Sequence, residues 1–427
     1  MAIAWPESFS GHAIFPARKI RSQRKRTRLR KEVIVPEQKD FQPSTLVIHS
    51  NRVYENQSNS ILFPIHQTAT YIHESVGVTK GYGYSRGANP TVNALEQAIA
   101  AVEGTETALC FRSGMAAIST LCLALLKAGD HVVLSDVLYG GTSRLFHQVL
   151  GNFGIEYSFA DTADVAAVEQ SLQPNTRLIF IETPANPTMK LTDVKALADL
   201  AHSRENVLLA VDNTFLTPLL QNCLDLGADI SMLSTTKYID GHNATIGGSL
   251  ATHNEALVER LRLVRKTLGT IQAPFDSWLA LQGIKTLPAR LAMHCAHAGE
   301  LAKWLENHPR VARVYYPGLD SFPQKALAEK QQKAFGGMLA FELNANTEDS
   351  LHFINALKLA TCAESLGSVE TLITNPATAS HCDLTPEVRA RLGITDHLIR
   401  LSVGLEAPKD LIADFEQAFA VVFGAEG

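Results

Sequence analysis

Lys237 is the residue whose surroundings point most directly to chemistry. It lies in the run Ser234-Thr235-Thr236-Lys237, directly after the apolar run 227–233, which is typical of a buried strand. A lysine amine can form a Schiff base with a carbonyl cofactor, and neighbouring hydroxyl groups can bond a phosphate. The pattern therefore favours a cofactor that carries both groups. The plainer alternative, an ordinary surface lysine after a strand, stays open on these residues alone.

Four other strand ends offer groups that suit the same cofactor. An apolar run ends at Asp212, and a carboxylate can pair with a ring nitrogen. Gly114 and Met115 open a helix after Ser113, where backbone N–H groups favour an anion. Tyr139, followed by two glycines, can stack on a planar ring, and Asn186 can bond a ring hydroxyl. Each has a simple alternative in a helix cap, a packed aromatic or a proline turn.

The elements that must position these residues alternate between strand and helix. This alternation predicts an α/β fold, in which a mostly parallel sheet is covered by helices and ligands gather at the carboxyl ends of the strands. We expect strands over 107–111, 131–134, 178–181, 207–211 and 227–233, and helices over 94–102 and 113–126. A second, smaller α/β part is expected from helices over 292–305 and 409–423 and strands over 311–315, 337–343, near 360 and 398–403. The predicted boundaries are therefore an extension (1–40), an N-terminal arm (41–98), a large domain (99–291) and a C-terminal domain (292–427).

Composition describes a globular chain with room for substantial cores. It has 427 residues, 46% of them hydrophobic, and a formal net charge of -5. No apolar run approaches the length of a membrane span and no secretory signal opens the chain, so we expect a cytoplasmic protein without a membrane partner. The charge gives no support to nucleic-acid binding by the main body. Six scattered cysteines, without metal-finger spacing, are expected to be reduced core thiols, and no metal site is expected.

Nine basic residues crowd into residues 18–31, and no acid follows the first of them until Glu32. Such a block repels itself and is expected to be disordered. Three alternatives stay open for it: a passive tail, an Arg-rich targeting peptide, or an arm that binds RNA or another anionic surface.

Several runs together carry a resemblance to a known family. The chain resembles the pyridoxal-phosphate enzymes of cysteine and methionine trans-sulfuration from about Thr45 to the C-terminus. The matching runs are Tyr84-Ser85-Arg86-Gly87, Ser113-Gly114-Met115-Ala116, Tyr139-Gly140-Gly141, Glu182-Thr183-Pro184-Ala185-Asn186-Pro187, Val211-Asp212-Asn213-Thr214, Ser234-Thr235-Thr236-Lys237-Tyr238, Ser365-Leu366-Gly367 and Arg400-Leu401-Ser402-Val403-Gly404.

The resemblance implies a fold-type I transferase that uses pyridoxal 5'-phosphate. Lys237 would hold the cofactor and shuttle protons, and Asp212 would grip the ring nitrogen. Tyr139 would stack on the ring and serve in substrate activation. The phosphate would be bound by Gly114, Met115, Ser234 and Thr236. Tyr84 and Arg86 would reach the phosphate of a neighbouring subunit, which implies a homotetramer of catalytic dimers. Arg400 would bind the substrate α-carboxylate.

Two departures and four further residues bear on which family member this is. The family usually has an aspartate where Asn243-Ala244 stands, and a second glycine where Ser368 stands. Gly141 argues against methionine γ-lyases, and Leu366 argues against the enterobacterial-type β-lyases. Glu364, before Ser365, and Arg144, which could meet a distal carboxylate, resemble cystathionine γ-synthases and γ-lyases.

The residues hardly separate synthase from lyase, and we favour a cystathionine γ-synthase that joins an O-acyl-homoserine to cysteine. The alternatives are a cystathionine γ-lyase and a homoserine-ester sulfhydrylase. From another class, a non-catalytic relative with an RNA-binding basic arm is the remaining hypothesis.

Overall fold

The computed structural model describes residues 41–50 and 60–424. The basic segment 18–31 lies outside the described residues. Residues 38–427 belong to one compact unit. Among the helices of the described ranges, none unites the length and the apolar character that crossing a bilayer requires.

A seven-stranded sheet forms the centre of the larger part of the chain. Its strands lie in the order β1-β7-β6-β5-β4-β2-β3, and β7 alone runs opposite to its neighbours. In chain order they are β1 (Ala108–Phe111), β2 (His131–Ser135), β3 (Glu156–Ala160), β4 (Thr176–Glu182), β5 (Leu208–Asp212), β6 (Ile230–Leu233) and β7 (Gly248–Ala251). The inner strands are buried along their length, as expected for a sheet covered on both faces. The predicted parallel sheet is confirmed, although the short strand β7 and the edge strand β3 were not foreseen.

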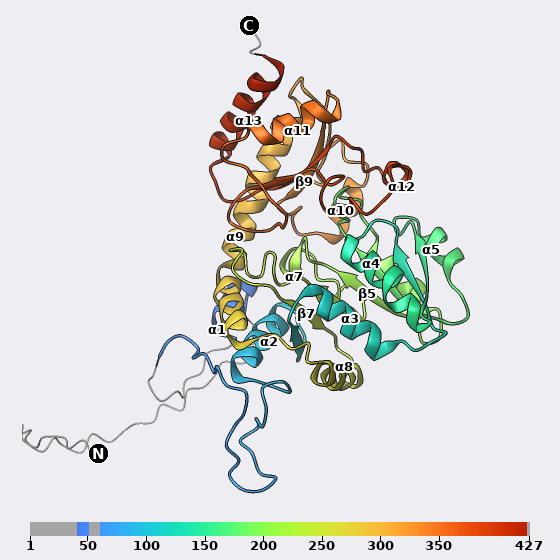
Figure 1. Cartoon of the computed structure of the whole chain (residues 1–427), viewed down its shortest axis with the longest axis vertical. Coiled ribbons are helices and arrows are strands. Elements are labelled where there is room, and N and C mark those ends of the chain that lie inside the picture. Colours follow the sequence, from blue (N-terminus) through green and yellow to red (C-terminus); the bar gives the residue numbers. More distant parts are fainter. Residues whose placement is uncertain (1–40, 51–59, 425–427) are drawn as a thin grey trace, which may run out of the picture. The chain divides into compact units, whose positions relative to one another are not determined.

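Helices before and between these strands cover the sheet (Figure 1). They are α2 (Pro90–Glu103), α3 (Gly114–Leu125), α4 (Gly140–Gln148), α5 (Val165–Ser171), α6 (Val194–His202), α7 (Thr217–Leu220) and α8 (Glu255–Leu268), with a 3-10 turn at Leu150–Phe153. Asn89 caps α2 and Ser113 caps α3, each by accepting a backbone N–H of the first turn.

A five-stranded, mainly antiparallel sheet organises the C-terminal part. Its order is β10-β11-β12-β9-β8, and only β10 and β11 pair in parallel. The strands are β8 (Val311–Tyr315), β9 (Met338–Leu343), β10 (Thr361–Cys362), β11 (Leu372–Thr374) and β12 (Leu398–Ser402). The helices here are α10 (Lys325–Gln331), α11 (Thr347–Ala356), α12 (Pro386–Arg391) and α13 (Pro408–Phe423). The predicted second, smaller α/β part is therefore present.

The long helix α9 (Pro274–Glu306) joins the two parts (Figure 1). Ile284 and Leu291 belong to the core of the large part, whereas Leu301 and Leu305 belong to the core of the small sheet. The sequence pattern predicted only residues 292–305 as helix. Pro288 lies inside α9 and removes one backbone donor. Burial on both sides of Pro288 keeps the helix continuous. The predicted domain boundary at 291–292 therefore falls inside α9.

Two helices of the N-terminal segment pack within the chain. Val47 in α1 (Pro43–His49) and Val92 and Leu95 in α2 are fully buried, in the same core cluster as α9. The predicted N-terminal arm (41–98) thus contains two helices that pack into the core of their own chain. The intervening segment instead exposes large apolar side chains, including Ile72 and Val76. Its contact with a neighbouring subunit stays a prediction.

All six cysteines are free, but they are not all core thiols. Cys110, Cys122 and Cys223 are buried and Cys295 is intermediate, whereas Cys362 and Cys382 are exposed.

Candidate active site

The predicted strand-end residues meet at one cavity of about 530 Å³. It lies where β1, β2, β4, β5 and β6 end at the same edge of the large sheet, and β12 and the loop after β10 contribute the remaining wall. The predicted residues that line it are Gly114, Met115, Tyr139, Arg144, Asn186, Asp212, Ser234, Thr236, Lys237, Glu364, Ser365 and Arg400. Strands separated by long stretches of sequence thus deliver an amine, carboxylates, a guanidinium and an aromatic ring to one place.

Lys237 is held inside this cavity by one side-chain contact. Its Nζ donates a hydrogen bond to Ser365 Oγ at 2.9 Å. Burial, followed by the positive charge of Arg400, lowers the pKa of Lys237 from 10.5 to about 8, although Glu364 opposes this shift. The amine is therefore much easier to deprotonate than an exposed lysine, as the chemistry expected of it requires.

Asp212 presents a carboxylate at the last position of β5. Its Oδ1 accepts hydrogen bonds from the backbone N–H of Thr214 at 3.1 Å and from Thr214 Oγ1 at 2.5 Å. Burial raises the pKa of Asp212 from 3.8 to about 6, while the two Thr214 bonds lower it. Asp212 is therefore anionic at neutral pH, and Thr214 fixes its orientation.

The start of α3 and the end of β6 form a tight, polar corner. Ser113 Oγ accepts the backbone N–H of Ala116 at 3.0 Å. A Cβ on Gly114 would lie 3.2 Å from both Met232 Cε and Ser234 Cβ, so a larger residue would require these neighbours to shift. The N–H groups of a helix N-terminus beside the Ser234 hydroxyl are suited to an anion such as a phosphate.

Thr236 completes this corner and is itself tied to β7. Its Oγ1 donates to the carbonyl of Gly247 at 3.2 Å and accepts the Gly247 N–H at 3.0 Å. The hydroxyl therefore has a defined position at the cavity wall.

Tyr139 precedes α4, and its ring stands half-exposed at the cavity, with an exposed fraction of 46%. A Cβ on Gly141 would collide with the Tyr139 ring and come within 3.1 Å of Met115 Sδ. Gly141 thus leaves room for the ring to lie close to the backbone of α4.

Arg400 is the buried cation of the site, not a surface arginine. It lies in the middle of β12 and is only 5% exposed. Nη1 donates to Asn186 Oδ1 at 3.2 Å and Nη2 donates to the carbonyl of Ser365 at 2.8 Å. Its Nε has no partner among the described residues. A buried guanidinium held on one side, with a donor still free, is prepared to bind a carboxylate.

Asn186 was expected to bond a ring hydroxyl. The structure shows its Oδ1 occupied by Arg400. Its contact with a cofactor ring stays a prediction, and its observed contact is with the arginine.

Glu182 is a site residue to which the sequence analysis gave no role. It ends β4 directly beside Asp212 and is 6% exposed. Its two carboxylate oxygens accept the backbone N–H groups of Tyr139 at 2.7 Å and Asn186 at 3.0 Å. Glu182 thus positions both the aromatic ring and the partner of Arg400. An acid at the end of a predicted strand, next to one that ends at Asp212, was the available signal.

Glu364 and Arg144 line the outer part of the cavity. Glu364 follows β10 and is exposed. Arg144 on α4 forms an ion pair with Asp383, with Nη1 and Oδ2 3.3 Å apart. Asp383 also lines the cavity and had not been singled out from the sequence.

Tyr84 and Arg86 do not line the cavity of their own chain. Tyr84 is 53% exposed, and Arg86 Nη1 donates to the carbonyl of Lys266 at 2.6 Å. The Arg86 guanidinium lies 5.7 Å from the centre of the Tyr84 ring. Their role toward a neighbouring subunit stays a prediction.

The two departures from the family pattern lie close together, because Asn243 and Ser368 both contact Glu370. Asn243 Nδ2 donates to Glu370 Oε2 at 3.0 Å, and Ser368 Oγ donates to the Glu370 carbonyl at 3.0 Å. Neither residue lines the cavity that holds Lys237.

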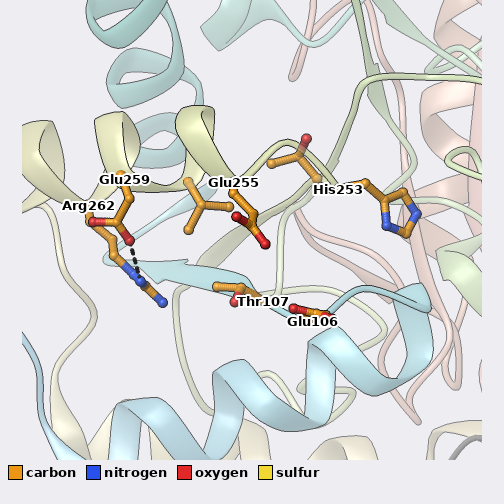
Figure 2. Close-up of a pocket in the computed structure, with 8 residues that line it drawn as sticks. Glu106, Thr107, His253, Glu255, Glu259 and Arg262 are labelled. Carbon is orange, nitrogen blue, oxygen red and sulfur yellow. Dashed lines mark hydrogen bonds and ion pairs between the residues drawn. The ribbon is translucent and has the colours of Figure 1, made fainter.

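A separate cavity of about 420 Å³ lies at the opposite edge of the large sheet, where β7 ends and β1 begins (Figure 2). Figure 2 shows His253 and Glu255 on one side of it and Glu106 and Thr107 on the other. Glu259 is paired with Arg262 at 2.6 Å. Within residues 41–50 and 60–424, no group of three or more His, Cys, Asp or Glu side chains is arranged to hold a metal.

The groups that line the Lys237 cavity fit pyridoxal phosphate. The amine matches the aldehyde, Asp212 matches the ring nitrogen, and the corner around Gly114 matches the phosphate. The fold and the site are those of a pyridoxal-phosphate-dependent enzyme.

Comparison with known proteins agrees with this class and narrows it. Residues 44–420 match the model of the Cys/Met metabolism PLP-dependent enzyme family. The chain belongs to this family.

Several relatives are similar over almost their whole length. The chain is 46% identical to a cystathionine gamma-lyase of Bacillus subtilis, over 88% of this chain and 98% of the relative. It is 44% identical to a cystathionine gamma-lyase of Dictyostelium discoideum, over 89% and 98% of the two chains. Among solved structures, metB from Corynebacterium glutamicum superposes with a TM-score of 0.87 at 40% identity, covering 90% of this chain and all of the other.

Proposed function

We propose that this protein is a cystathionine γ-lyase, which splits cystathionine into cysteine, 2-oxobutyrate and ammonia. The names of the relatives at 44% and 46% identity support this choice. The sequence had led us to favour the synthase, on little evidence from particular residues. Both enzymes work at the γ-carbon of a homoserine skeleton, so the same catalytic residues serve either reaction.

The lowered pKa of Lys237 supports the γ-elimination step that lyase and synthase share, whereas the choice of the lyase rests on the names of the relatives. γ-Elimination requires a base that removes a proton from Cα and then one from Cβ before the Cγ–S bond breaks. With a pKa of about 8, about one Lys237 side chain in ten is neutral at pH 7, against fewer than about one in a thousand for an ordinary lysine. Its place beside Ser365 and near Arg400 supports the role of proton carrier at those two carbons.

Three other groups would hold the cofactor, which when bound supplies an electron sink for the negative charge that develops at Cα. Asp212 would keep the ring nitrogen protonated. The N–H groups of Gly114 and Met115 would bind the phosphate with the hydroxyls of Ser234 and Thr236. Tyr139 would lie against the ring.

Arg400 would bind the α-carboxylate of the substrate. The position of its guanidinium is supported by the bonds to Asn186 and to the Ser365 carbonyl. Because Ser365 also contacts Lys237, one short loop would align the substrate carboxylate with the base that removes the Cα proton.

A cystathionine γ-synthase is the second candidate. It is favoured by the likeness to the cystathionine gamma synthase of Xanthomonas oryzae pv. oryzae, solved with aminoacrylate and cysteine, which has a TM-score of 0.86 at 36% identity and covers 89% of this chain and 99% of that one. The deciding experiment compares kcat/KM for 2-oxobutyrate release from cystathionine with kcat/KM for cystathionine formation from O-succinylhomoserine and cysteine. A larger value for the first reaction supports the lyase, and a larger value for the second overturns it.

We further propose that the protein assembles as a homotetramer of catalytic dimers, in which residues 60–88 reach a neighbouring subunit. The support is the exposure of apolar side chains such as Ile61, Ile72 and Val76, which are 83%, 96% and 102% exposed. Such a surface is costly in water and suits burial against another chain. Tyr84 and Arg86 would then serve the neighbour's phosphate site.

A further inference from the structure

Asp383 and Arg144 form an ion pair across the outer end of the Lys237 cavity. Arg144 lies on α4 in the large part of the chain, whereas Asp383 lies in the loop between β11 and α12 of the small part. Both side chains are about half exposed, at 51% and 62%. The ion pair is therefore accessible both from solvent and from the cavity.

The backbone beneath this pair is closely packed, which gives the two charges a defined separation. A Cβ on Gly140, at the start of α4, would lie 2.8 Å from the carbonyl oxygen of Ser380. Arg144, Ser380 and Asp383 also line a second cavity of about 630 Å³ on the far side of the pair. Arg144 and Asp383 line both cavities, so a substrate that extends beyond Lys237 in this direction would meet both charges.

Each member of the pair keeps hydrogen-bonding capacity for a ligand. The contact uses Nη1 of Arg144, and a guanidinium carries further N–H donors. On Asp383 the contact uses Oδ2, whereas Oδ1 has only a long contact of 3.8 Å with the Cys382 thiol. One cation and one anion are thus available side by side.

We propose that Asp383 is a specificity-determining residue, which together with Arg144 selects substrates whose distal end is an amino acid. The distal ammonium group of cystathionine would pair with Asp383 and its distal carboxylate with Arg144. A distal carboxylate without an ammonium group, as in O-succinylhomoserine, would compete with Asp383 for Arg144 and be repelled by it. The assignment of substrates rests on the proposed function at Lys237, although the charge arrangement is independent of it.

Asp383→Asn tests the proposal, because it removes the charge and keeps the shape. Three substrates report through the same product, since cystathionine, O-succinylhomoserine and O-acetylhomoserine all release 2-oxobutyrate on γ-elimination. Their distal ends are a zwitterion, an anion and a neutral group. The holoenzyme is assayed with each, alongside Asp383→Glu, which keeps the charge, and Asp410→Asn, which removes an exposed acid on α13.

In Asp383→Asn, the ratio of kcat/KM for cystathionine to kcat/KM for O-succinylhomoserine should fall by about fivefold to tenfold. Cystathionine loses a partly exposed charge contact, whereas O-succinylhomoserine loses a repulsion. O-acetylhomoserine should change little, Asp383→Glu should restore most of the ratio, and Asp410→Asn should not alter it. An unchanged ratio in Asp383→Asn, or an equal fall with all three substrates, would overturn the proposal.

The experiment distinguishes an error in the proposed function from an error in this inference. If the wild-type protein turns over none of the three compounds, the assignment at Lys237 is wrong. The affinity of each compound, measured from the change in cofactor absorbance on titration, then still tests Asp383. Equal affinity ratios in wild type and Asp383→Asn would reject its role.

Discussion

Glu182 and Asp212 end neighbouring parallel strands as direct cross-strand partners, and both are buried. Two carboxylates cannot both ionise cheaply in such a place. Burial and the negative charge of Asp212 raise the pKa of Glu182 from 4.5 to about 8, while the pKa of Asp212 reaches only about 6. At neutral pH the pair therefore carries one negative charge, on Asp212, where a cofactor ring nitrogen needs it.

This pair predicts a specific pH dependence of stability. Folding raises the pKa of Glu182, so the protonated carboxyl stabilises the folded state. This contribution to the free energy of unfolding is complete below about pH 4.5 and is lost as the pH rises through about 8. In the cofactor-free protein, Glu182→Gln should flatten this dependence, by on the order of 3 kcal/mol at most between about pH 5 and about pH 8.

Urea unfolding of wild type and Glu182→Gln at the two pH values measures the difference. Glu156→Gln, on the edge strand β3, is the matched control and should leave the dependence as in wild type. If the free energy of unfolding changes with pH by the same amount in wild type and Glu182→Gln, Glu182 ionises normally in the folded protein.

The lowered pKa of Lys237 predicts the pH dependence of cofactor binding. The neutral amine attacks the cofactor aldehyde, so the rate at which cofactor-free protein takes up pyridoxal phosphate should rise with pH through about 8. Stopped-flow absorbance measures this rate. Because the charge of Arg400 helps to lower the Lys237 pKa, Arg400→Gln should move the midpoint upward. A midpoint near 10 in the wild type would contradict the buried environment described for Lys237.

Gly141 is predicted to be required for the position of Tyr139. In Gly141→Ala the new methyl group collides with the Tyr139 ring, so kcat should fall by about tenfold or more while the fold persists. Gly299→Ala on α9 is the control, since its nearest neighbour, Tyr316 Oη, is 3.9 Å from the added atom. Steady-state kinetics and circular dichroism of both variants measure the effect. Wild-type kcat in Gly141→Ala would show that the ring position is not critical.

If Arg86 serves the site of a neighbouring subunit, two inactive variants should complement each other. Subunits carrying Arg86→Ala and subunits carrying Lys237→Ala are mixed, dissociated and reassembled. A hybrid catalytic dimer has one site with both defects and one intact site, so activity should return to about a quarter of wild type for random pairing. If Arg86 acts within its own chain, the mixture should stay inactive.

Much of the site could be predicted from sequence because each strand end has a local signature. Asp212 and Lys237 follow apolar runs, and Gly114 follows a helix cap, so their meeting at one sheet edge follows from the parallel topology. The helix α9 was predicted too short, because the buried faces on both sides of Pro288 that sustain it are visible only in three dimensions.

The residues that were missed depend on contacts between distant segments. Glu182 is important because its oxygens accept N–H groups from two other loops, and Asp383 because it meets Arg144 across the two parts of the chain. Neither relation has a spacing that a sequence could show. The same holds for Asn186, whose partner Arg400 lies 214 residues further along the chain.

Replacement of Lys237 is the most direct test of the account. Purified wild type should show visible absorbance from covalently held cofactor and release 2-oxobutyrate from cystathionine. In Lys237→Ala the covalent absorbance should be absent and kcat/KM should fall by a factor on the order of a thousand or more, whereas Lys285→Ala, at a lysine on α9 whose pKa is also lowered by burial, should keep both. Full turnover in Lys237→Ala would contradict the mechanism at its centre.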